Sequence, residues 1–165
     1  MTALLTACAL ACVLQSEWGL SAEDAQEHAW HAERAASERD HVDAELLLAV
    51  VHTETRFRAT DVTRACKWGR CTWMCGVGQS RAKTKRQCYA LQPLEAGYRE
   101  LARELAWWIQ NQHGDLRHAI AGHGCGYAKK GSRKTSLQCG RRKGKRSYEA
   151  RVLESLRRIR ARRVP

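Results

Sequence analysis

Long stretches of the chain place an apolar residue at every third or fourth position, which is the period of an α-helix buried on one face. This pattern predicts a mainly α-helical protein, and no strand pattern competes with it. The predicted helices cover residues 22–39, 44–55, 94–112, 116–122 and 148–162.

Capping residues support two of these helices. Ser21 is followed by Glu23 and Asp24, which is typical of an N-cap with acidic residues in the first helical turn. Asp43 stands directly before the strongly apolar helix 44–55 and is expected to cap it in the same way.

The apolar period lapses between residues 56 and 90, where glycines mix with four cysteines. We predict an irregular segment pinned by disulfides that forms one wall of a cleft. Residues 124–145 are rich in Gly, Lys and Ser and predict a second loop. The expected fold is therefore a single, mainly α domain with irregular, disulfide-pinned loops.

The chain has eight cysteines in 165 residues. Six lie in its body, at Cys66, Cys71, Cys75, Cys88, Cys125 and Cys139. An even set at uneven spacing fits three disulfides and an oxidising, extracytoplasmic compartment. Spacing alone does not determine how six cysteines pair; the pairs chosen here are Cys75 with Cys88 and Cys125 with Cys139.

The other two cysteines, Cys8 and Cys12, lie in an apolar run over residues 3–14. This run resembles the core of a secretory signal, the end of a lipoprotein signal at Leu5-Thr6-Ala7-Cys8, or a first buried helix. It is shorter than the roughly 20 residues that span a bilayer as a helix. Residues 1–20 are accordingly a signal or anchor segment or a first helix, and residues 21–165 form the domain.

Charge is distributed unevenly along the chain. The formal net charge is +12, and residues 129–165 hold 15 Lys and Arg against two acidic residues. The rest is close to neutral, which predicts a basic face that docks on an anionic wall or membrane surface, with an ordinary solvated surface as the alternative.

One carboxylate continues an apolar helix face. Leu47, Val50, Val51 and Glu54 share one face of the predicted helix 44–55. Burial raises the pKa of a carboxyl group and keeps it protonated, as a general acid requires. The alternative is a structural ion pair between Glu54 and a neighbouring arginine.

Several segments, taken in chain order, resemble the lysozyme-like superfamily of soluble lytic transglycosylases and goose-type lysozymes. The segments are Asp43-Ala44-Glu45-Leu46-Leu47, Glu54-Thr55-Arg56-Phe57, Gly76-Val77-Gly78-Gln79, Ala119-Ile120-Ala121-Gly122-His123-Gly124, and Tyr148 with Arg151 and Val152. The resemblance implies a lysozyme-like domain in which Glu54 is catalytic and Thr55, Gln79, His123 and Tyr148 bind the substrate.

The chain departs from the family pattern at the fourth segment. His123 and Gly124 replace a Tyr-Asn pair of which the tyrosine helps to orient the catalytic acid and the asparagine contacts the substrate. A histidine can donate a hydrogen bond to a carboxyl group, so catalysis can persist with His123 in this position. A plain loop histidine is the alternative.

The resemblance implies cleavage of the β-1,4 bond between N-acetylmuramic acid and N-acetylglucosamine in peptidoglycan glycan strands. We expect a lytic transglycosylase, which forms 1,6-anhydro ends and requires no second carboxylate. A hydrolytic muramidase normally needs a second acid, for which Asp61 is the candidate. An inactive wall-binding or assembly protein of the same fold is another alternative. No cofactor, metal or specific nucleic acid is implied, and a monomer is expected.

Two further expectations concern aromatic and cysteine residues. Trp73 is a candidate for stacking on a sugar ring, whereas Trp107 and Trp108 are expected to pack in the core. A rival hypothesis makes Cys66, Cys71 and Cys75 a zinc site in a basic nucleic-acid-binding module, although the spacing is poor for zinc.

Overall fold

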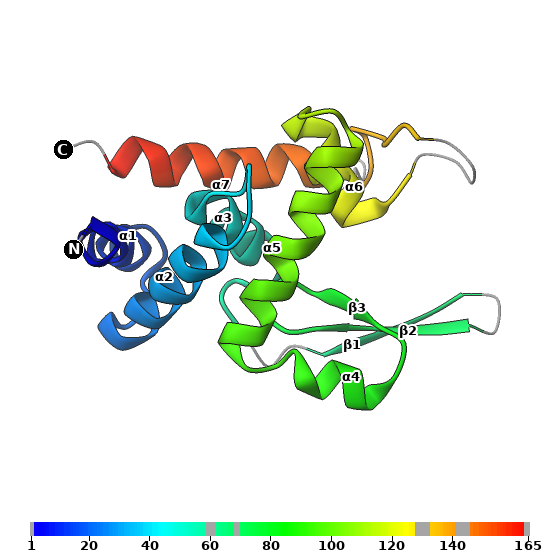
Figure 1. Cartoon of the computed structure of the whole chain (residues 1–165), viewed down its shortest axis with the longest axis horizontal. Coiled ribbons are helices and arrows are strands. Elements are labelled where there is room, and N and C mark those ends of the chain that lie inside the picture. Colours follow the sequence, from blue (N-terminus) through cyan, green and yellow to red (C-terminus); the bar gives the residue numbers. More distant parts are fainter. Residues whose placement is uncertain (1, 59–61, 68–69, 128–132, 141–145, 164–165) are drawn as a thin grey trace.

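The computed structural model describes residues 2–58, 62–67, 70–127, 133–140 and 146–163, without the side chains of residues 2–5, 65–67, 70 and 71. The described chain is mainly helical, with a small antiparallel sheet and two disulfides (Figure 1). The helices are α1 (Thr2–Trp18), α2 (Ala22–Ser37), α3 (Ala44–Thr55), α4 (Lys85–Ala90), α5 (Leu94–Asn111), α6 (Leu116–Cys125) and α7 (Tyr148–Arg162).

Helix α3 is the centre of the fold. Asp43 caps it through a 2.7 Å hydrogen bond from the Leu46 amide, as its sequence predicts. All residues from Ala44 to Val51 are buried, because α2, α5 and α7 surround the helix (Figure 1). An apolar helix covered on all sides stabilises the fold through burial and holds its C-terminal end in a fixed position.

The other predicted helices are confirmed with small shifts at their ends. Ser21 caps α2 by accepting from the Asp24 amide, and α5 and α7 bury the apolar stripes that their sequences predict, including Leu101, Leu105 and Val152. Helix α6 is longer than expected and continues to Cys125.

Residues 2–18 form helix α1, which packs against α2 and α7. Leu10, Val13 and Leu14 of this helix are buried, whereas Cys8 and Cys12 are exposed free thiols. No helix in the described part of the chain has the length and hydropathy of a membrane-spanning segment.

The segment between α3 and α5 contains a sheet that the sequence pattern did not predict. Strands β1 (Thr63–Lys67), β2 (Arg70–Cys75) and β3 (Ser80–Ala82) pair antiparallel in that order. Only a small apolar cluster around Cys75, Ala82 and Cys88 is buried beneath them. The strand sequences lack a regular alternation of apolar and polar residues, and backbone pairing together with the Cys75–Cys88 disulfide holds them.

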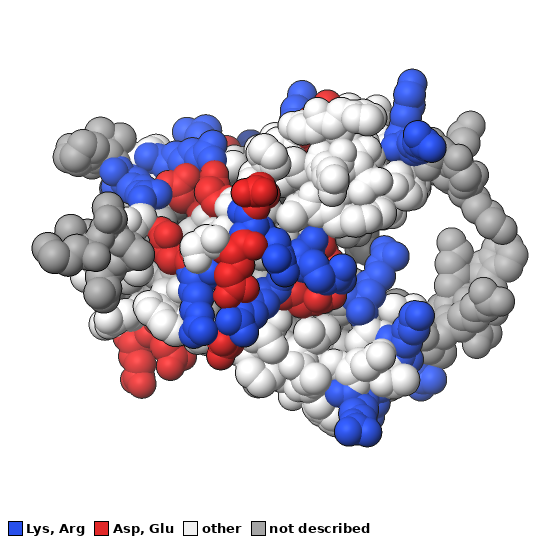
Figure 2. All heavy atoms as spheres, in the orientation of Figure 1, with Lys and Arg blue, Asp and Glu red and all other residues white. Residues whose placement is uncertain are grey.

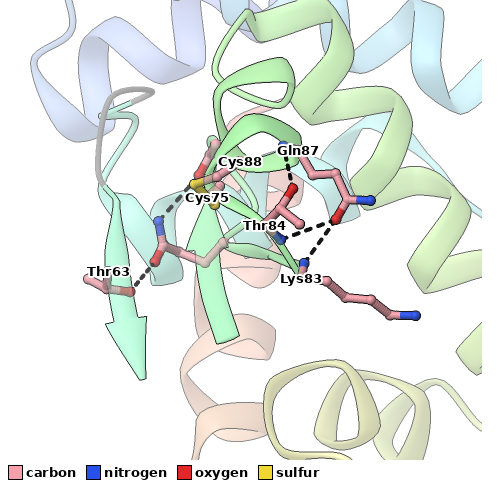
Figure 3. The surroundings of a disulfide bond; sticks show 8 residues. Thr63, Cys75, Lys83, Thr84, Gln87 and Cys88 are labelled. Atoms are coloured by element: carbon pink, nitrogen blue, oxygen red, sulfur yellow. Dashed lines mark hydrogen bonds between the residues drawn. A yellow bond between two sulfur atoms is a disulfide. The ribbon is translucent and has the colours of Figure 1, made fainter. Parts of the chain in front are cut away.

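Both disulfides chosen from the sequence are present. Cys75 pairs with Cys88 and joins β2 to α4, beside the capping box in which Thr84 and Gln87 start α4 (Figure 3). Cys125 pairs with Cys139. Cys66 and Cys71 are opposite each other in the β1–β2 register. Their side chains, and with them the predicted third disulfide, lie outside the part of the chain whose side chains are described.

Candidate active site

Glu54 lies in the last turn of α3, where the helix ends. Arg56 is the C-cap, and Arg56 and Phe57 have positive φ angles of 52° and 66° that turn the chain away from the helix. The Glu54 side chain is partly exposed and faces a cavity. The sequence thus placed this carboxyl group correctly at the end of an apolar face.

The cavity has a volume of about 300 Å³ and lies where α3, the sheet, α5 and α6 meet. Its lining residues are Glu54, Met74, Gln79, Arg81, Arg103, Glu104, Trp107, Trp108, Gly122, His123 and Gly124. Three predicted site residues, Glu54, Gln79 and His123, therefore share one cavity, although they are far apart in the sequence. Figure 2 shows the surface hollowed between the α6 side and the sheet side of the molecule.

Burial raises the pKa of the Glu54 carboxyl above its ordinary value, while the Tyr148 hydroxyl and the Arg151 guanidinium act in the opposite direction. The raised pKa shows that burial outweighs both. A carboxyl group in this state retains its proton at higher pH than an exposed glutamate. The structural ion-pair alternative is not observed, since Glu54 forms no salt bridge with any described residue.

Tyr148 lies behind Glu54 in the first turn of α7. Its ring is buried, and its hydroxyl acts on the Glu54 carboxyl although it forms no hydrogen bond of regular geometry. The Tyr148 amide donates to the carbonyl of Cys139 at 3.0 Å, and Cys139 is bonded to Cys125 at the end of α6. The disulfide thereby ties α6 to the start of α7.

His123 is a neutral imidazole in the cavity wall. Its side chain is 4% exposed, and its pKa is lowered to about 4 by burial and by Arg81, against a hydrogen bond to the backbone of Gly78 that acts in the opposite direction. Its Nδ1 atom lies 3.5 Å from Oε2 of Glu104. His123 therefore lies in helix α6 and lines the cavity, and the carboxyl group beside it is that of Glu104.

Glu104 is a second carboxyl group in the same cavity, and sequence reasoning missed it. Its Oε2 accepts from Ser80 Oγ at 3.3 Å. Burial and the nearby charge of Glu100 raise its pKa. The sequence does contain an indication of Glu104. It follows Leu101 by three residues and precedes Trp108 by four, which places its carboxyl group on the buried face of α5.

The other predicted site residues have different surroundings. Gln79 lines the cavity, but its amide group binds the Gly76 carbonyl at 3.4 Å and the Thr63 hydroxyl at 3.0 Å. Thr55 is buried away from the cavity lining and donates to the carbonyls of Val51 and Val77. Its contacts join α3 to the loop before β3.

Asp61, the candidate second acid, lies outside the described residues. Among the described residues, Glu104 is the carboxyl group besides Glu54 that lines the cavity.

The aromatic residues differ from expectation. Trp107 is 45% exposed and lines the cavity instead of packing in the core, so that prediction was wrong. Trp108 packs against the core, as predicted, and also reaches the cavity. Trp73 lies beneath the Arg64 guanidinium, 5.5 Å from it, and is not among the lining residues.

Two glycines of α6, Gly122 and Gly124, lie where the packing leaves no space for a side chain. A Cβ atom at Gly122 would overlap the Trp108 ring, and one at Gly124 would overlap the Tyr148 ring. These close contacts explain why small residues flank His123 in this helix.

The chain was compared with protein families, curated proteins and solved structures. No family model, curated protein or solved structure matches the chain. A functional proposal therefore depends on the site itself.

A zinc site has little support in the described residues. Cys75 and Cys88 are joined to each other in a disulfide, and no group of three His, Cys, Asp or Glu side chains gathers as metal ligands within the described ranges.

Proposed function

We propose that the protein cleaves the β-1,4 bond between N-acetylmuramic acid and N-acetylglucosamine in peptidoglycan, acting as a lytic transglycosylase with Glu54 as the catalytic acid. The observation that carries this proposal is a carboxyl group of raised pKa at the wall of a cavity, fixed at the end of the central helix. General acids of glycoside cleavage require such a protonated carboxyl group.

In the proposed reaction, Glu54 donates its proton to the glycosidic oxygen as the bond to the anomeric carbon breaks. The C6 hydroxyl of the muramic acid then attacks the oxocarbenium-like centre, and the Glu54 carboxylate takes the hydroxyl proton. The products are a strand with a 1,6-anhydro end and a strand with a free 4-hydroxyl. Glu54 is restored to its protonated form without consuming water.

The surroundings of Glu54 support this sequence of steps. The Tyr148 hydroxyl and Arg151 lie close enough to influence the carboxyl group and stabilise its ionised form after proton donation. His123 is held neutral by burial, so it can hydrogen-bond to sugar groups without adding a charge that would ionise Glu54.

The shape of the surface supports a polymeric substrate. A second cavity of about 790 Å³ shares Arg103 and Trp107 with the Glu54 cavity, and both residues belong to α5. The two cavities are therefore neighbours, with Arg103 and Trp107 in the wall of each. The exposed Trp107 ring offers an apolar face at the border of the two cavities, on which a sugar ring can stack.

A hydrolytic muramidase is the second candidate, and Glu104 is the observation that favours it. A second carboxyl group in the cavity could activate water or stabilise the positive centre. However, burial and Glu100 raise the pKa of Glu104 as well, which disfavours the ionised form that either role needs. We therefore keep the transglycosylase as the main proposal.

Digestion of purified peptidoglycan, followed by mass spectrometry of the soluble fragments, tests the proposal. Fragments with 1,6-anhydro-muramic acid ends support the transglycosylase, and fragments with reducing ends indicate the muramidase. If the intact protein releases no fragments, both enzymatic proposals fail and a wall-binding or assembly role takes their place.

A further inference from the structure

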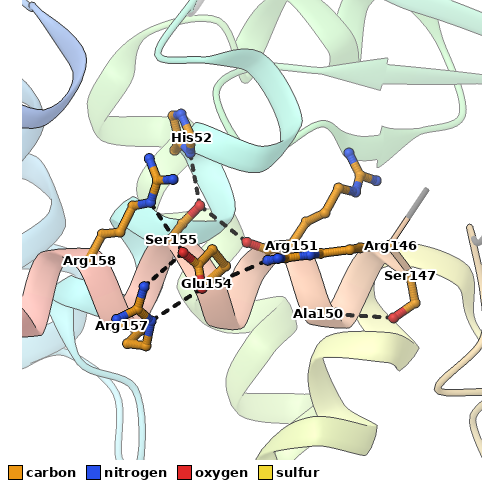
Figure 4. Close-up of polar contacts among 9 residues, drawn as sticks. All are labelled: His52, Arg146, Ser147, Ala150, Arg151, Glu154, Ser155, Arg157 and Arg158. Carbon is orange, nitrogen blue, oxygen red and sulfur yellow. Dashed lines mark hydrogen bonds and ion pairs between the residues drawn. The ribbon is translucent and has the colours of Figure 1, made fainter. Parts of the chain in front are cut away.

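A separate cavity lies between the end of α3 and the first half of α7. Its volume is about 240 Å³, and its lining residues are His52, Thr53, Arg56, Arg146, Arg151, Glu154, Ser155 and Arg158. None of these residues lines the Glu54 cavity. The arrangement of most of them is shown in Figure 4.

The lining of this cavity is strongly positive. Four guanidinium groups surround it, with Glu154 as the single carboxylate in the lining. Glu154 is shared among several arginines: it lies 2.9 Å from Arg157, 3.3 Å from Arg158 and 3.8 Å from Arg146. Figure 4 shows Arg157 on the other side of α7 from His52, so part of the Glu154 charge is directed away from the cavity.

Arg56 and Arg151 have no carboxylate partner within 4.0 Å among the residues that the structure describes. The Arg151 guanidinium lies 5.7 Å from the Tyr148 ring and acts on Glu54 only at longer range. Two cationic side chains without an ion pair thus face the same small cavity. Mutual repulsion among four guanidinium groups is unfavourable unless an anion accompanies them.

The arginines at the C-terminal end of α7 and its C-cap Arg163 pair with carboxylates of other segments. Arg160 pairs with Asp43 and Glu45, Arg163 pairs with Glu45, and Arg162 pairs with Glu17. Among the arginines of α7, Arg151 is therefore the one without an ion pair to a described residue, and it lines the cavity.

Neutral polar groups complete the cavity wall. His52 Nδ1 lies 2.9 Å from Ser155 Oγ (Figure 4). Its ring stacks on Trp18 with centroids 4.3 Å apart. The ring is therefore fixed in place beside the guanidinium groups and reports on any charge that enters the cavity.

We propose that this cavity binds a phosphate group, held by Arg56, Arg146, Arg151 and Arg158. Guanidinium groups match the oxygens of phosphate with paired, charge-assisted hydrogen bonds. A phosphate monoester carries nearly two negative charges at neutral pH and offsets the excess positive charge better than one carboxylate does. The group can belong to a soluble phosphate compound or to a lipid headgroup, and the experiment below separates the two.

Isothermal titration with inorganic phosphate at low salt tests the site without any glycan, so its outcome is independent of the proposed function. We expect saturable binding at one site. Arg56→Gln and Arg151→Gln should each weaken it by about tenfold or more, which is the effect of losing one strong charge-assisted contact. The His52 ring resonances should shift during the titration of the intact protein.

Arg86→Gln is the matched control, because Arg86 is exposed on α4 and lines neither cavity. This variant should bind phosphate like the intact protein. Circular dichroism of each variant excludes loss of folding as the cause of weaker binding. The proposal is overturned if phosphate does not saturate, or if Arg86→Gln weakens binding as much as the cavity variants do.

Vesicles of phosphatidylcholine with and without phosphatidylglycerol identify the source of the phosphate. If Arg56→Gln loses binding to the anionic vesicles and Arg86→Gln keeps it, the cavity receives a lipid headgroup. If both variants bind the vesicles equally while Arg56→Gln loses inorganic phosphate, the cavity receives a soluble phosphate compound.

Discussion

The ring of Tyr148 lies directly against Gly124, so closely that a Cβ atom at position 124 would overlap it. The resembled superfamily has an asparagine at the position of Gly124. In this protein a side chain there would collide with the Tyr148 ring, so the glycine goes together with the packing of that ring. Tyr148 occupies the space, and its hydroxyl acts on Glu54 from behind.

We predict that Gly124→Asn, which introduces the asparagine of the resembled superfamily, destabilises the protein. Displacing the buried Tyr148 ring should lower the free energy of unfolding by about 1–3 kcal/mol. Thermal or urea unfolding measures the change. Gln110→Asn is the control, because Gln110 is exposed on helix α5 and the substitution adds no atom to a packed site. Equal stability of both variants would contradict the packing argument.

Helices and their caps could be predicted from the sequence because they depend on residues that are close together in the chain. The bounds of α3 follow from an apolar run and the Asp43 cap. The sheet was not predicted, because the sequences of its strands do not alternate apolar and polar residues. Only a small apolar cluster around Cys75 and Ala82 lies against the strands. Their pairing depends on contacts between segments, which periodicity does not report.

The candidate site was predictable only in part for the same reason. Glu54 was identified because it continues an apolar face within one helix. Glu104 was missed because its role depends on the packing of α5 against α6, which brings it within 3.5 Å of His123. Trp107 is exposed for a related reason: it lies beside the buried face of α5 and borders the Glu54 cavity.

The pair of His123 and Glu104 gives a prediction about mechanism. If water activation is not required, Glu104→Gln should lower the rate of fragment release by less than about tenfold and leave the 1,6-anhydro ends unchanged. A carboxylate that activates water would contribute about 100-fold or more. A loss of that size, together with reducing ends in the products of the intact protein, would identify a muramidase.

Buried histidines predict a loss of stability in mild acid. His28 is held between the Tyr98 hydroxyl at 2.8 Å and the Phe57 carbonyl at 3.2 Å, and burial lowers its pKa from 6.5 to about 4. As the pH falls below 6.5, the unfolded chain takes up this proton before the folded one does. The free energy of unfolding should therefore decrease between pH 6.5 and about 4, by at most about 3 kcal/mol from His28.

Urea unfolding of the intact protein and of His28→Gln at pH 7 and pH 4.5 measures this contribution as a difference. The variant should be less stable at pH 7 and should lose less stability on acidification. His41→Gln, at an exposed position, should follow the intact protein. Parallel pH dependence of the intact protein and His28→Gln would show that His28 is not the titrating group.

The disulfide between Cys125 and Cys139 closes a loop with a sequence separation of 14 and holds α6 beside the start of α7. Replacing both cysteines by serine should cost about 3 kcal/mol of stability. It should also reduce fragment release, because α6, which carries His123, and the start of α7, which carries Tyr148, are no longer held in fixed positions relative to each other. The matching double variant of Cys75 and Cys88 should cost a similar amount. Unchanged melting temperatures after either replacement would show that these disulfides do not stabilise the fold.

The most direct test of the proposed function compares peptidoglycan digestion by the intact protein, Glu54→Gln and Glu27→Gln, where Glu27 is exposed on α2. With Glu54 as the catalytic acid, the intact protein and Glu27→Gln release fragments with 1,6-anhydro ends, and Glu54→Gln releases them at least about 100-fold more slowly while remaining folded. Equal release by Glu54→Gln and the intact protein would contradict the account.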